Sequence, residues 1–112
     1  MLKIIPKLFI IIFSSFLFSE LRVPIDGAVL NSIYLVFEWN QEPDCTEYQI
    51  QVSYDDMFSD LIVDQYTSST YYIDQTNFYW LNTYYWHVKC IDNSIQSWNQ
   101  IYQFQIHFQY EL

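Results

Sequence analysis

The chain has 112 residues, 52% of them hydrophobic and 21% aromatic, so it has room for one domain and can bury a substantial core. This composition excludes a disordered chain, and the single glycine excludes collagen-like and glycine-rich linker sequences. The formal net charge of −9 argues against nucleic acid and anionic membranes as partners, because both repel carboxylates.

A targeting signal is expected at the N-terminus. Lys3 and Lys7 lead into an apolar run at residues 8–18, about 11 residues long, which suits a signal peptide and is short for a membrane span. An uncleaved anchor is the alternative. We expect residues 1–19 to be a signal peptide and residues 20–112 to form one domain, secreted to the periplasm or the extracellular space and without a membrane span.

Removal of the signal leaves a strongly acidic domain with two cysteines. Arg22 and Lys89 remain against 13 carboxylates, a net charge of 2 − 13 = −11. Cys45 and Cys90 allow a single internal disulfide in a secreted chain, and two free buried thiols are the alternative.

The rest of the chain is expected to form strands. Apolar and polar side chains alternate with period two in four segments, which is typical of strands buried on one face. In the clearest of these, Tyr102, Phe104, Ile106 and Phe108 alternate with three glutamines and a histidine. With shorter apolar runs included, the expected strands are residues 21–24, 33–39, 48–53, 61–63, 70–73, 84–90 and 102–109. About seven short strands with no helix predict an all-β sandwich, with turns between them such as Asp26-Gly27.

Several short motifs occur in a characteristic order. Trp39 ends an alternating strand, residues 48–53 read Tyr-x-Ile-x-Val-x, residues 78–84 form a turn that leads into a strand through Tyr84, and Ser97-Trp98 precedes Tyr102-x-Phe104. Their order and spacing resemble a fibronectin type III domain of the bacterial secreted type over residues 21–108.

The resemblance implies an immunoglobulin-like sandwich of about seven antiparallel strands. Tyr84 would be the corner tyrosine whose hydroxyl ties down the preceding turn, although Trp80 stands where the family has a proline. The core residues that it implies are Trp39, Tyr48, Tyr84, Trp86 and Phe104. Because the family's strands C and F are neighbours, Cys45 before the first and Cys90 at the end of the second are expected to form a disulfide.

No constellation in the sequence resembles an active site, so we expect a non-catalytic protein without a cofactor or metal. His87 and His107 are predicted on outward faces, where exposed unliganded histidines are favoured over a zinc site. Three carboxylates within residues 54–60 are an alternative calcium site. A solvated turn with Phe58 tucked into the edge of the sandwich is the favoured interpretation.

The number of aromatic side chains exceeds what a core of this size requires. Tyr34 and Tyr85 are predicted to face away from the core and are candidate ligand-facing residues; packing across strands is the alternative. The sequence therefore favours a secreted or cell-surface module for protein–protein contact or spacing, with a polysaccharide-binding module as the alternative. Tyrosines gathered on one sheet would favour the second function, and scattered tyrosines the first.

Overall fold

The structure is a computed structural model that describes residues 21–92 and 97–108. The predicted signal peptide, residues 1–19, lies outside these ranges. Within them, no helix is long and apolar enough to cross a membrane.

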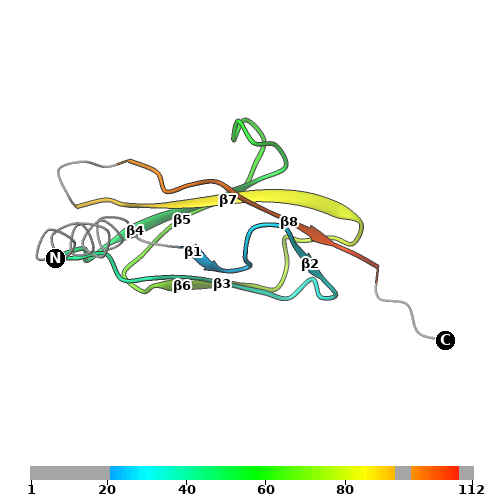
Figure 1. Ribbon diagram of the computed structural model, residues 1–112, viewed down its shortest axis with the longest axis horizontal. Helices are drawn as coiled ribbons and strands as arrows, with labels where there is room; N and C mark the ends of the chain where they lie inside the picture. The colour runs from blue at the N-terminus through cyan, green and yellow to red at the C-terminus, as the bar shows by residue number, and fades with distance from the viewer. Residues whose placement is uncertain (1–20, 93–96, 109–112) are drawn as a thin grey trace, which may run out of the picture.

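Eight strands in the described ranges form two stacked sheets (Figure 1). The strands are β1 Leu21–Val23, β2 Ala28–Leu30, β3 Leu35–Trp39, β4 Tyr48–Ser53, β5 Leu61–Thr67, β6 Tyr71–Asp74, β7 Asn82–Cys90 and β8 Tyr102–Ile106. One sheet has the order β1-β3-β6 and the other the order β2-β8-β7-β4-β5. The prediction of an all-β sandwich is confirmed.

The sandwich differs from the prediction by one strand and one pairing. β2 was not predicted, and it runs parallel to β8, with Val29 opposite Gln105. The turn before it explains this position: the Gly27 N–H donates to the Gln103 carbonyl at 2.7 Å, and the Gln103 N–H donates to the Asp26 carboxylate at 2.8 Å. Three residues are too few to show an alternating pattern, so the sequence contains no signal for β2 beyond the turn.

Two strand ends differ from the expected ones by more than two residues. β5 continues to Thr67, whereas a strand was expected only over residues 61–63. β8 ends at Ile106, so Phe108 lies beyond the sheet and is 54% exposed. The prediction that Phe108 shares the inward face of its strand is therefore wrong. Its ring packs instead against Trp80, with the ring centroids 6.0 Å apart.

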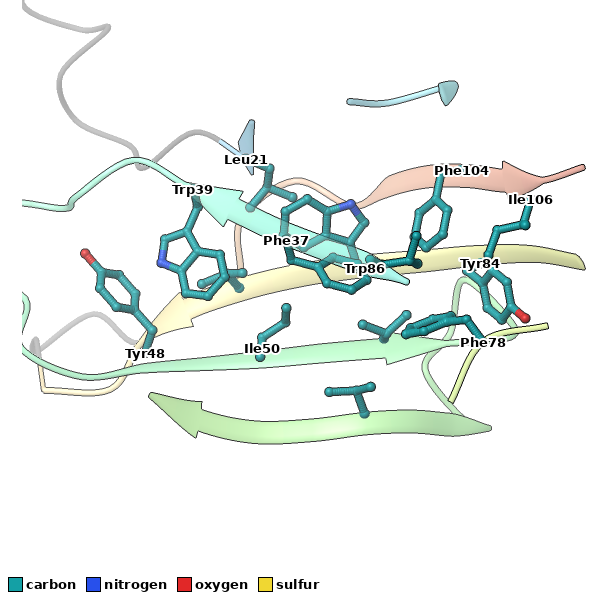
Figure 2. Close-up of a cluster of buried hydrophobic side chains, with 14 of the residues drawn as sticks. Leu21, Phe37, Trp39, Tyr48, Ile50, Phe78, Tyr84, Trp86, Phe104 and Ile106 are labelled. Atoms are coloured by element: carbon teal, nitrogen blue, oxygen red, sulfur yellow. The ribbon is translucent and has the colours of Figure 1, made fainter. Parts of the chain in front are cut away.

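The core fills the space between the sheets with side chains from alternate positions of β3, β4, β7 and β8 (Figure 2). Phe37 lies in the middle, with its ring centroid 5.1 Å from that of Trp86 and 5.8 Å from that of Phe104. Trp39, Tyr48, Tyr84, Trp86 and Phe104 are each no more than 2% exposed. Each such side chain contributes roughly 1.5–3 kcal/mol by its burial.

Candidate functional site

The turn before β7 is held by the hydroxyl of Tyr84. This hydroxyl accepts a hydrogen bond from the Tyr79 N–H at 3.0 Å and donates one to the Tyr79 carbonyl at 3.2 Å. Burial raises the pKa of Tyr84, so the hydroxyl keeps its proton at neutral pH. Trp80, for which the resemblance implied a proline, lies inside this turn, and both hydrogen bonds are formed around it.

A disulfide between Cys45 and Cys90 joins the loop before β4 to the end of β7. Tyr48 and Cys90 are opposite each other in the antiparallel pair of these strands, so the two cysteines meet at one end of the sheet. Asp92 reinforces this end, since its carboxylate accepts hydrogen bonds from the N–H and the hydroxyl of Thr46. Cys45, Cys90 and Asp92 are the one group of three metal-ligand types within the described ranges. Its sulfur atoms are bonded to each other and are therefore not thiolate ligands.

The acidic loop at residues 54–60 is organised by Asp55. Its carboxylate accepts hydrogen bonds from the Ser53 hydroxyl at 2.7 Å, the Ser59 hydroxyl at 2.6 Å and the Asp60 N–H at 3.1 Å. Hydrogen bonds from Ser59 and then Ser53 lower its pKa to about 2. The carboxylate oxygens of Asp55 thus accept hydrogen bonds from its own loop and from the end of β4, which supports a structural role in the β4–β5 turn.

This loop brings Phe58 onto the outer face of the five-stranded sheet. Phe58 has a positive φ of 55°, an unfavourable conformation for a bulky residue, and its ring lies flat on His87 with the centroids 3.7 Å apart. The Trp98 ring also stacks on His87, with the ring centroids 3.8 Å apart. The Lys89 ammonium lies 4.6 Å from the centre of the Trp98 ring. We call Phe58, His87 and Trp98 the aromatic stack.

The prediction that His87 is an exposed histidine is wrong, because the aromatic stack leaves only 5% of it accessible. The side chain does point outward, but loops cover it. Its Nε2 lies 2.9 Å from the Gln51 amide oxygen. Burial, followed by the nearby charge of Lys89, lowers its pKa to about 4, so His87 is neutral at pH 7. The predicted place of Phe58, at the sandwich edge, is also wrong, because its ring lies on His87, on the outer face of the five-stranded sheet.

The two histidines do not form a pair. His107 is exposed and lies beyond β8, where Ile106 is opposite Asn82 at the start of β7. His87 is at least five residues further along β7, roughly 17 Å away at the usual rise per residue.

Within the described ranges, no loop covers the outer face of the three-stranded sheet in this way. Val36 and Ile73 are opposite each other on β3 and β6, and both are exposed. Tyr34 and Tyr71 extend the same face, and Val23 on β1 adds to it. We call these five residues, which are between 40% and 66% exposed, the outer apolar face: Val23, Tyr34, Val36, Tyr71 and Ile73.

The tyrosines with outward side chains are divided between the two sheets. Tyr34 and Tyr71 belong to the outer apolar face. Tyr85 is half-buried on the opposite side of the sandwich, between Ser53 on β4 and Gln103 on β8. The two candidate ligand-facing residues, Tyr34 and Tyr85, therefore cannot contact one ligand together. Nothing in the sequence pattern separates them, since both alternate with buried neighbours.

Two of the solved structures with the same architecture are similar over most of their length. One is an Fn3-like protein from Clostridium thermocellum, with 22% identity and a TM-score of 0.56, covering 76% of this chain and 91% of that protein. The other is FN3tt, with 15% identity and a TM-score of 0.51, covering 80% of this chain and 95% of that one. No protein-family model and no curated protein matches the sequence. At these identities the likenesses bear on the fold alone.

Proposed function

We propose that this chain, which has the fibronectin type III fold, is a non-catalytic secreted or cell-surface module that contacts another protein through its outer apolar face. The observation that carries the proposal is the contrast between the two outer faces. On one face the aromatic stack covers the area around His87, while the other face leaves the five apolar side chains of the outer apolar face accessible. Contiguous exposed apolar groups are typical of contact surfaces.

Four titratable side chains in the described ranges have structural partners, which supports a role without catalysis. Asp55 and Asp92 accept hydrogen bonds within turns, and His87 lies inside the aromatic stack. Asp74 is buried and accepts hydrogen bonds from Tyr72 and Asn77. Groups whose partners are structural in this way are not free to exchange protons with a substrate.

Carbohydrate binding is the second candidate, because Tyr34 and Tyr71 are both exposed on one sheet face and sugar rings stack on aromatic rings. Two aliphatic side chains, Val36 and Ile73, lie opposite each other on the strands between them. A face that is largely aliphatic suits a protein surface better than a polysaccharide.

The test is site-specific photo-crosslinking in the cells that produce the protein. A photoreactive phenylalanine would replace Tyr71 on the outer apolar face or, as a matched control, Tyr66, which is similarly exposed on the outer face of β5. We expect one discrete protein adduct from position 71 and none from position 66. Competition by the unlabelled domain, but not by its Val36→Asp variant, would assign the adduct to this face. Equal labelling from both positions would contradict the proposal.

Co-sedimentation with insoluble polysaccharides distinguishes the second candidate. Under the proposed function, the mature domain stays in solution with every polysaccharide. Binding that Tyr34→Ala abolishes and Tyr85→Ala preserves would instead show a carbohydrate site on the three-stranded sheet.

A further inference from the structure

We infer that the protein docking on the outer apolar face presents an arginine or lysine, set among apolar side chains, to Glu38. This extends the proposed function by giving the chemistry of the partner. It depends on one acidic residue inside an otherwise apolar surface.

Glu38 occupies the middle strand of the three-stranded sheet. It is opposite Val23 of β1 on one side and opposite Tyr71 of β6 on the other. Val36, the next outward residue along β3, is also apolar and exposed. Glu38 itself is half-buried, so its side chain lies partly within this surface.

Glu38 forms no ion pair with a basic residue in the described ranges. The two basic residues of these ranges are Arg22 and Lys89. Lys89 lies over Trp98, on the outer face of the other sheet. Arg22 precedes Val23 on β1, and its side chain is exposed.

A protein docked on the outer apolar face would bury the Glu38 carboxylate. A purely apolar partner would leave it without water and without a counter-charge, which is strongly unfavourable. A cationic side chain at the same place compensates the lost hydration and also selects the partner, because uncharged or acidic surfaces are penalised.

A second copy of this chain is the wrong occupant for the same reason. Two identical faces would bring two Glu38 carboxylates into one interface, and each copy carries a formal net charge of −9, or 2 − 13 = −11 without the predicted signal peptide. A basic, partly apolar partner has the complementary charge.

A phage-displayed random peptide library tests the inference without knowledge of the natural partner. The library is selected on the immobilised mature domain and counter-selected on its Val36→Asp variant, so that only peptides bound at the outer apolar face remain. Synthetic peptides are then titrated against the wild type, Glu38→Gln, Glu38→Lys and the control Asp56→Lys. Asp56 is an exposed carboxylate in the acidic loop of the other sheet, so this control reports the general effect of added positive charge. Circular dichroism shows that each variant is folded.

We expect the retained peptides to share an arginine or lysine between apolar residues. Glu38→Lys should weaken their binding at least about tenfold, Glu38→Gln should weaken it less, and Asp56→Lys should change it little. Retained peptides without a cationic residue, or peptides insensitive to Glu38→Lys, would overturn the inference and leave the proposed contact intact. Loss of every peptide in the counter-selection step would instead count against the proposed function itself, and the inference would fall with it.

Discussion

His87 illustrates how a polar side chain becomes part of a second, smaller core. Phe58 and Trp98 enclose its ring from two sides, and Gln51 provides its hydrogen-bond partner. The nearest positive charge, Lys89, is on the same strand and opposes protonation. Burial and the charge of Lys89 both lower the pKa of His87, so the folded state favours the neutral imidazole.

This enclosure predicts a loss of stability in mild acid. Burial lowers the pKa of His87 to about 4, below its usual value of 6.5, so the unfolded chain binds more protons than the folded one between these pH values. The free energy of unfolding should therefore be highest above pH 6.5 and fall as the pH drops towards 4, by at most ~3 kcal/mol for this group. Urea unfolding at pH 7 and pH 4.5 measures the change.

The variants His87→Phe and His107→Gln separate this effect from other titrations. The first should reduce the dependence on pH, and the second, in which an exposed histidine is replaced, should retain it. An unchanged pH dependence in His87→Phe would show that another group is responsible.

A second prediction concerns the hydroxyl of Tyr84. The substitution Tyr84→Phe removes two hydrogen bonds to the Tyr79 backbone while keeping the buried ring, and should lower the free energy of unfolding by about 1 kcal/mol. Chemical denaturation measures it, with Tyr34→Phe as the control because the Tyr34 side chain is exposed. Equal effects of the two substitutions would argue against the corner role.

Among the structural elements, the β4–β7 pair carries the disulfide and the centre of the larger sheet. Six consecutive residue pairs join these strands, from Tyr48 opposite Cys90 to Ser53 opposite Tyr85. The Cys45–Cys90 bond spans 45 residues and closes the end at which the pair begins.

Removing this bond should destabilise the domain substantially. In the chain-entropy model, a loop of this length corresponds to about 4 kcal/mol, so reduction should shift the urea midpoint markedly. The double variant Cys45→Ala/Cys90→Ala should unfold like the reduced protein. Two titratable thiols in the unfolded, unreduced protein would instead show that the bond does not form.

For the molecule as a whole, charge opposes self-association in spite of the outer apolar face. The chain without the predicted signal peptide, residues 1–19, should sediment as a monomer at both low and physiological salt, because copies with a net charge of 2 − 13 = −11 repel one another. Sedimentation velocity over a range of concentrations is the measurement. A dimer that Val36→Asp dissociates would mean that the face binds its own copy, and would contradict the inference of a basic partner.

The alternating patterns of the sequence were sufficient for the sandwich itself. Leu35, Phe37 and Trp39 lie buried while Tyr34 and Val36 are exposed, because the pleat of a strand sends neighbouring side chains to opposite faces. The order of Trp39, Tyr48 and Tyr84 likewise pointed to the arrangement of the strands. These features depend on local alternation and on the order of elements along the chain.

The pattern could not show what lies over each outer face. His87 and Tyr34 both alternate with buried residues, yet one is enclosed and the other is exposed. The difference arises from Phe58 and Trp98, which come from loops 40 residues apart and meet only in the folded molecule. A strand pattern states which side of its own strand a residue takes. Whether that side is covered depends on contacts between distant segments. In this molecule such contacts enclose His87, whereas the outer apolar face is exposed.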